Sequence, residues 1–270
     1  MRRADSVDGL ELISHVPESP SRPVPLLFVH GAFVGAWCWD DNFLPYFEQQ
    51  GYSAHALSLR GHGTSSGQEE LLTASIDDYE SDVLRIARHI GGPVVVVGHS
   101  MGGMVVQRCL HRIDAAGAVL MASVPTEGLL GSSFLLAARD PALYQEINLL
   151  QYTHPKFASM HGLRHAVFSN RVPEAELNRH FERMQAESQR AVFDLSWPQH
   201  FFIGHAEDVP VLVMGGEEDA FFRPSMIEST AKIYGVEPEI FPEMGHAMML
   251  EPDWQLAADR IIGWLGENGL

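Results

Sequence analysis

The sequence is poor in cysteine and has no long apolar run. Its 270 residues include two cysteines, Cys38 and Cys109, too few to build the disulfide framework of a small secreted domain. We expect both to be buried free thiols in a reducing compartment. No stretch approaches the roughly 18 apolar residues of a membrane-spanning helix, and no apolar stretch follows the basic start at Arg2 and Arg3. The sequence therefore predicts a cytoplasmic protein without a membrane span, although it leaves export by another route open.

Basic residues are also scarce. The chain carries 18 Lys and Arg against 35 Asp and Glu, which gives a formal net charge of −17. Such a charge repels nucleic acids and anionic membranes, so we expect a small-molecule partner. We find no internal repeat and no low-complexity tract. A length of 270 residues with 46% hydrophobic residues suits one large α/β domain with an insertion, or two small domains. The oligomeric state is not indicated.

Continuous apolar runs alternate with helical patterns along most of the chain. This order is typical of an α/β fold with a mostly parallel central sheet and helices on both faces. A short alternating stretch occupies residues 7–16. Expected strands lie at 26–29, 52–59, 94–97, 118–121, 211–214 and 239–241. Expected helices lie at 40–50, behind a capping box at 75–78, and at 253–265.

Residues 124–205 have a different pattern, without strand-like runs. Leu143, Ile147 and Leu150 are spaced as on one face of a helix. The same spacing predicts one helix that begins after Pro173 and carries Leu177, Phe181, Met184, Ser188 and Val192. We therefore expect a core of residues 1–123 and 206–270 with a helical cap insertion at 124–205. The insertion would cover the carboxyl edge of the sheet.

The most informative stretch is Gly98-His99-Ser100-Met101-Gly102-Gly103. Four valines precede it and a helical pattern follows. This arrangement puts Ser100 on a sharp strand-to-helix turn, with its hydroxyl exposed and helix N–H groups beside it. Glycines are needed there because a side chain would crowd the turn. Ser100 is therefore the candidate nucleophile.

A serine hydroxyl needs a base, and the base needs an orienting acid. His246 follows Gly245 on a loop before the last expected helix, and is the candidate base. The expected strand at 211–214 is followed by Glu217, Glu218 and Asp219. We favour Asp219 as the acid because of its offset from the strand, while either glutamate stays open if the loop register is shifted.

An oxyanion site is expected beside the serine. His30-Gly31-Ala32-Phe33 follows directly on the early strand at 26–29. A backbone N–H of this loop can pair with the N–H of Met101 to bind the oxyanion of a tetrahedral intermediate.

With these motifs in hand, the chain resembles the α/β-hydrolase superfamily over nearly its whole length, in particular carboxylesterases and lipases. Residues 30–39 are also similar to plant methylesterases and hydroxynitrile lyases. The resemblance implies an α/β-hydrolase fold, with Ser100 as nucleophile, His246 as general base and acid, and Asp219 as orienting carboxylate. It further implies that Ala32 and Met101 donate the oxyanion hole through their N–H groups. The matching stretches are residues 30–31, 61–65, 98–103, 216–219 and 245–246.

We expect a serine hydrolase that cleaves carboxylic esters through an acyl-enzyme and needs no cofactor. Its partner would be a small-molecule ester. Phe33, Phe221 and Met248 are the expected substrate-binding residues. Met248 and Met249 follow His246 so closely that we expect one of them to face the site.

We expect the other histidines of these motifs to have no catalytic role. His99 is expected to point away from Ser100 and to support the turn, and His62 is expected to be structural. His161 and His165 stand four apart, but no third ligand is evident. We expect no metal site.

Several alternatives stay open. The same triad serves thioesterases, lactonases, carbon–carbon bond hydrolases, cofactor-free haloperoxidases and hydroxynitrile lyases. Epoxide hydrolases and haloalkane dehalogenases are disfavoured because those relatives carry aspartate at the position of Ser100. An alternative from another class is a ligand-binding protein that keeps the fold without turnover. A thioesterase for coenzyme A would need cations near the entrance, and the insertion offers Arg139, Arg164, Arg171 and Arg179.

Overall fold

The computed structural model describes residues 1–152, 159–204 and 208–270. Its strands form one sheet in the order β1-β2-β4-β3-β5-β6-β7-β8. The pairs from β4 to β8 are parallel, and β2 runs antiparallel to both of its neighbours. The strands are β1 Arg2–Val7, β2 Leu10–His15, β3 Leu26–Val29, β4 Ala54–Leu57, β5 Val94–His99, β6 Ala115–Met121, β7 Val211–Gly216 and β8 Glu239–Phe241.

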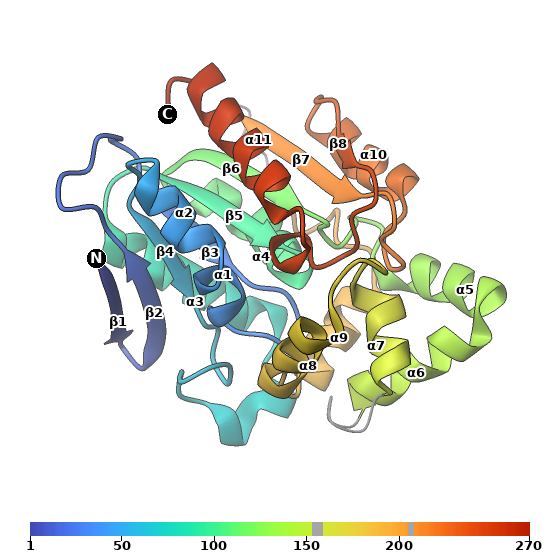
Figure 1. The fold of residues 1–270 in the computed structure, drawn as a ribbon. Coiled ribbons are helices and arrows are strands. Elements are labelled where there is room, and N and C mark those ends of the chain that lie inside the picture. The colour runs from blue at the N-terminus through green and yellow to red at the C-terminus, as the bar shows by residue number, and fades with distance from the viewer. Residues whose placement is uncertain (153–158, 205–207) are drawn as a thin grey trace.

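Helices connect the parallel strands (Figure 1). They are α1 Trp37–Asp40, α2 Phe43–Gln49, α3 Ile76–Ile90, α4 Met101–Cys109, α5 Leu129–Arg139, α6 Pro141–Tyr152, α7 Met160–Val167, α8 Glu174–Arg183, α9 Gln189–Ser196, α10 Pro224–Ile233 and α11 Trp254–Glu267. Short 3₁₀ helices lie at Gln68–Thr73, Leu110–Arg112 and Met248–Leu250.

The valines of β5 show why helices cover both faces of the sheet. Successive side chains of a strand point to opposite faces. Val95 and Val97 accordingly join one apolar core, with residues of α1, α2 and α11. Val94 and Val96 join a second core, with residues of α3, α4 and α10. The expected α/β fold with a mostly parallel sheet is confirmed.

Among the described residues between β6 and β7 are five helices, α5 to α9. Residues from all five line the cavity that also contains Ser100, so this group covers the carboxyl edge of the sheet (Figure 1). The domain boundaries at 123/124 and 205/206 stay a prediction. The prediction of a single helix after Pro173 is wrong, because this stretch forms two helices, α8 and α9. Met184 ends α8 with an extended backbone, and the side chain of Ser188 caps the start of α9.

In the amino-terminal half, the structure agrees with the predicted capping box at 75–78 and adds a strand to the predicted stretch at 7–16. The capping box is confirmed, since Ser75 and Asp78 bond reciprocally at the start of α3. The stretch at 7–16 is half of a hairpin, whose first strand, β1, the alternation did not predict. Asp8 and Gly9 form its two-residue turn with φ of 49° and 85°, the conformation that Asp-Gly favours in hairpins.

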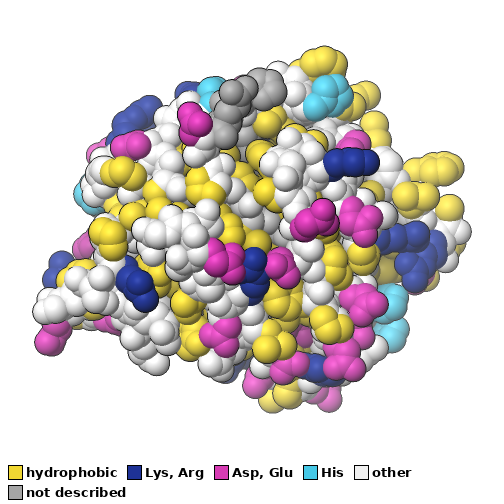
Figure 2. All heavy atoms as spheres, turned by 90° about the horizontal axis from the view of Figure 1, so that it is seen from above, with side chains coloured by type: hydrophobic (Ala, Val, Ile, Leu, Met, Phe, Trp, Pro, Cys, Tyr) yellow, Lys and Arg dark blue, Asp and Glu magenta, His cyan; other side chains and the backbone are white. Residues whose placement is uncertain are grey.

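Both cysteines are fully buried, Cys38 in α1 and Cys109 at the end of α4, and burial raises the pKa of each thiol. On the face seen in Figure 2, acidic, basic and hydrophobic side chains are interspersed, so this face carries no uniform basic patch. Within the described ranges, no helix combines the length and apolarity needed to cross a membrane.

Candidate active site

Ser100 occupies a sharp turn between β5 and α4. Its backbone has φ of 52° and ψ of −117°, a conformation that costs a non-glycine residue of order 1–3 kcal/mol. The end of β6 and the segment that follows it hold Ser100 there. The Ser100 N–H donates to the carbonyl of Met121 at 3.0 Å, and the Ser100 carbonyl accepts from the N–H of Val124 at 3.1 Å. The turn therefore places Ser100 between β5 and α4, in the wall of the cavity.

Gly102 leaves the space that this turn requires. A Cβ built on Gly102 would lie 2.3 Å from the carbonyl oxygen of His30 and 2.5 Å from that of Val29. Both contacts are with backbone, which cannot move aside as a flexible side chain can. The helix α4 can approach β3 this closely only with glycine at this position.

A carboxylate and a histidine meet at the same edge of the sheet. Nδ1 of His246 donates to Oδ2 of Asp219 at 2.7 Å. The other carboxylate oxygen accepts the N–H groups of Phe221 at 2.7 Å and Phe222 at 2.9 Å. Both partners of the pair are buried, and this hydrogen bond fixes which imidazole nitrogen faces away from the acid. The side chains of Glu217 and Glu218 do not take this place, because both residues are exposed.

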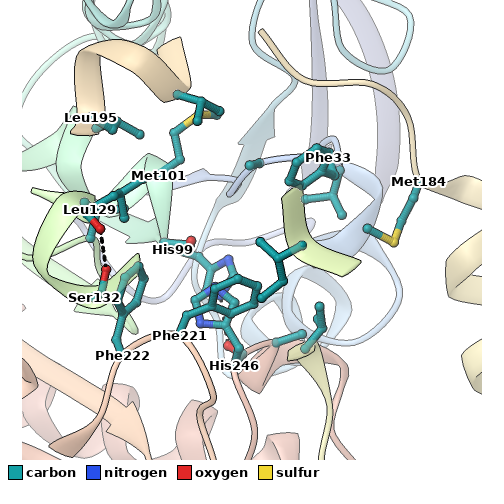
Figure 3. Close-up of a pocket in the computed structure, with 18 of the residues that line it drawn as sticks. Phe33, His99, Met101, Leu129, Ser132, Met184, Leu195, Phe221, Phe222 and His246 are labelled. Atoms are coloured by element: carbon teal, nitrogen blue, oxygen red, sulfur yellow. Dashed lines mark hydrogen bonds between the residues drawn. The ribbon is translucent and has the colours of Figure 1, made fainter. Parts of the chain in front are cut away.

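His99 supports the histidine loop rather than only its own turn. Its Nε2–H donates to the carbonyl of His246 at 2.9 Å, and the two rings lie 4.8 Å apart. Burial, followed by the charge of His246, lowers the pKa of His99, so the ring is neutral. The ring of His99 also lines the cavity (Figure 3), while its expected direction away from Ser100 stays a prediction.

Two backbone N–H groups are available beside Ser100. Ala32 and Met101 both line the cavity that contains Ser100 and His246. Within the described part of the chain, neither backbone N–H has a hydrogen-bond acceptor. Phe33, which follows Ala32, has a left-handed φ of 68°.

The cavity has a volume of about 270 Å³ and largely apolar walls. Phe33 and Met184 lie on one side, with Leu129, Leu195 and Phe222 on the other (Figure 3). Of the expected substrate-binding residues, Phe33 and Phe221 line it.

One of the two methionines lines the cavity, as expected, but it is not Met248, whose choice as a substrate-binding residue is wrong. Its neighbour Met249 takes the position, while Met248 is buried in the apolar core beside the sheet. The two residues lie in a 3₁₀ turn, where successive side chains point about 120° apart.

His180 is a polar residue in the cavity wall that the sequence did not single out. Its ring is stacked between Trp37 and Phe168, with centroid distances of 6.1 and 5.8 Å. Burial lowers its pKa, so the ring is neutral. Its Nδ1 is buried and has no hydrogen-bond partner among the described residues. Nothing in the spacing of 173–192 distinguishes it from a surface histidine.

Two further buried carboxylates, which the sequence did not single out, lie near the site. Glu251 accepts the N–H groups of Ser169 at 2.7 Å and Gly245 at 3.2 Å, and so supports the loop that carries His246. Burial raises the pKa of Glu251. Glu187 lies between α8 and α9 and contacts the loop of Phe33. Their partners are distant in sequence, and no motif marks them.

Metal ligation finds no support in the geometry. His161 and His165 both lie in α7. Over the described ranges, no group of three His, Cys, Asp or Glu side chains is arranged to hold a metal ion.

The model of the alpha/beta hydrolase family matches residues 26–258. The chain belongs to this family. Among solved alpha/beta hydrolase structures it is similar to a thermophilic esterase from Thermogutta terrifontis, with a TM-score of 0.73 and 18% identity over 99% of both chains. It is also similar to an esterase from Exiguobacterium antarcticum, with a TM-score of 0.73 and 17% identity over 97% of this chain and 98% of that one.

Characterised relatives match this alpha/beta hydrolase over shorter segments. It is 31% identical to salicylic acid-binding protein 2 of Nicotiana tabacum over 48% of this chain and 52% of that protein. It is 29% identical to a pyrethroid hydrolase of Sphingobium wenxiniae over 41% of this chain and 40% of that protein. It is 32% identical to methyl jasmonate esterase 1 of Vitis vinifera over 32% of this chain and 33% of that protein. The chain thus spans about half, or less, of the length of these relatives.

Proposed function

We propose that this alpha/beta hydrolase cleaves carboxylic esters through an acyl-enzyme on Ser100. The observation that carries the proposal is the convergence of three features at one apolar cavity. These are a serine on a left-handed turn, the His246–Asp219 pair, and two backbone N–H groups without acceptors. The names of relatives such as methyl jasmonate esterase 1 are consistent with this class of reaction.

In the first half of the reaction, the Oγ of Ser100 attacks the ester carbonyl carbon, and Nε2 of His246 takes the hydroxyl proton. The carbonyl oxygen gains the negative charge and accepts from the N–H groups of Ala32 and Met101. The tetrahedral intermediate collapses, the carbon–oxygen bond to the alcohol breaks, and His246 returns the proton to the leaving alcohol.

In the second half, water attacks the acyl-enzyme and His246 takes its proton. The second tetrahedral intermediate collapses and releases the carboxylic acid, while Ser100 regains its proton from His246. Asp219 holds the imidazole in one tautomer and stabilises its charged form throughout. No cofactor takes part.

The substrate class follows from the walls of the cavity. Apolar side chains favour a modest acyl or aryl group over a charged one. Helices α5 to α9 supply much of this wall, so we further propose that residues 124–205 act as a cap that selects the substrate.

Initial rates on p-nitrophenyl esters from acetate to palmitate test the proposal. The wild type should turn over at least one ester, and Ser100→Ala should lower kcat by at least about 1,000-fold. Ser225→Ala, an exposed serine on α10, is the matched control and should keep wild-type rates.

Two results would overturn the proposal. One is a folded wild type that hydrolyses none of the esters. The other is a Ser100→Ala variant as active as the control, since the reaction would then not pass through this hydroxyl.

A further inference from the structure

The stretch between α8 and α9, residues 184–188, is bound to the loop that carries Ala32. The N–H of Gln185 donates to the carbonyl of Phe33 at 2.9 Å. Oε2 of Glu187 accepts the N–H of Phe33 at 3.3 Å. Both backbone polar groups of Phe33 are therefore bound by one segment of the helical insertion. Met184, its first residue, lies on the same side of the cavity as Phe33 (Figure 3).

Phe33 needs this support. Its φ of 68° is uncommon for a residue with a side chain. The N–H that Glu187 binds belongs to the peptide unit joining Ala32 to Phe33. Holding that unit limits the rotation of Ala32, which lines the cavity. The N–H of Ala32 itself belongs to the preceding peptide unit and has no acceptor among the described residues.

The carboxylate of Glu187 is itself held on all sides. Besides Phe33, it accepts the hydroxyl of Tyr79 at 2.8 Å, the N–H of Ser188 at 2.6 Å and Nε2 of His62 at 3.1 Å. It is 2% exposed, so its position is set by these bonds rather than by water.

His62 faces an acceptor on each ring nitrogen. Nε2 meets Glu187, and Nδ1 meets the carbonyl of Arg60 at 3.0 Å. Both nitrogens must carry hydrogen to bond in this way, which describes the charged ring. Burial lowers the pKa of His62, but the charge of Glu187 and the bond to it outweigh burial and raise it. Burial raises the pKa of Glu187, but the charge of His62 and the hydrogen bonds from His62, Ser188 and Tyr79 together outweigh burial and lower it.

We infer that Glu187 is a positioning residue for the oxyanion hole, which holds the Ala32–Phe33 peptide through the Phe33 N–H while His62 and Tyr79 hold its carboxylate. This inference rests on the proposed ester hydrolysis and assigns the Gly61-His62-Gly63 turn a role in it. The insertion then supports the chemistry as well as the substrate.

The test compares Glu187→Gln with Glu182→Gln, the same change at an exposed carboxylate of α8. Glu187→Gln removes the charge that pairs with His62, and should lower kcat by about 10- to 100-fold with KM little changed, because a misplaced donor acts in the transition state. Its Kd for phenylboronic acid, which binds serine as a tetrahedral adduct, should rise by a similar factor. Glu182→Gln removes an exposed charge that has no contact with the loop of Phe33, and should keep kcat within about threefold.

Hydrogen exchange in the wild type gives a second measurement that needs no variant to fold. The Phe33 amide should exchange far more slowly than an unstructured peptide, because it is bonded inside a closed segment. Exchange at the unstructured rate would overturn the inference. So would a folded Glu187→Gln with wild-type kcat, or one whose loss lies in KM alone. A wild type that hydrolyses no ester would instead refute the proposed function, whatever the exchange rate.

Discussion

The edge of the sheet and the helices that cover it are built differently. At the sheet edge, Ser100, Asp219 and His246 are each less than a tenth exposed and are held by hydrogen bonds to strands or adjoining loops. In the covering helices, α5 has no buried residue, and Phe134 is 75% exposed. In the proposed reaction, chemistry thus depends on the part of the molecule with more buried contacts, whereas the shape of the cavity depends on the part with fewer.

The largest effect should come from breaking the pair at the sheet edge. Asp219→Asn keeps the shape but allows the wrong tautomer of His246, and should lower kcat by about 10⁴-fold. The measurement is kcat on the best nitrophenyl ester, with Glu218→Gln, an exposed neighbouring carboxylate, as control. An Asp219→Asn variant within about tenfold of that control would mean that Asp219 does not orient the base.

Replacing one glycine by alanine in each region should change the free energy of unfolding by different amounts at the sheet edge and in the covering helices. In Gly102→Ala the Cβ meets backbone oxygen at 2.3 Å, so we expect a loss of about 3 kcal/mol or more, measured by thermal unfolding. Gly131→Ala in α5 has no atom within 4 Å of its Cβ, and should be neutral or stabilised by up to about 1 kcal/mol. Equal losses for both would contradict this contrast between the two regions.

The smallest effect should be a change of preference within the insertion. Leu136 lines the cavity, and its neighbour Leu135 does not and is 47% exposed. Leu136→Ala should shift the ratio of kcat/KM between long and short esters by about tenfold, while Leu135→Ala leaves the ratio unchanged. If both variants shift it alike, the insertion does not select the substrate through its inner face.

Prediction from the sequence succeeded where local patterns and the fold demand the same residues. The valines of β5 are buried on both faces, so the run is unbroken, and the glycines beside Ser100 answer a steric need of the turn itself. The choice of Asp219 among three acids rested on its offset from the strand, and the structure brings that residue to His246. Such features are local and leave traces in spacing.

The misses have physical reasons of their own. The strand β1 is exposed and has no apolar face, so no alternation of apolar and polar residues marks it. The Asp-Gly turn is the local signal for its pairing with β2. Helical spacing continues through Met184 and Ser188 without Pro or Gly, yet bonds from Gln185 and Glu187 to distant loops interrupt the helix. Contacts between residues more than a hundred positions apart leave no periodic trace.

The two buried cysteines can report, through their rates of thiol labelling, how often the structure around them opens. Cys38 lies in the layer of α1, α2 and α11, and Cys109 in the layer of α3, α4 and α10, on opposite faces of the sheet. A thiol reagent reaches Cys109 only when its layer opens, whereas Cys38 also lines the cavity and can be approached from there. The labelling rate at Cys109 would therefore time the opening of its layer, and the rate at Cys38 would also respond to a compound that fills the cavity, in the unmodified protein.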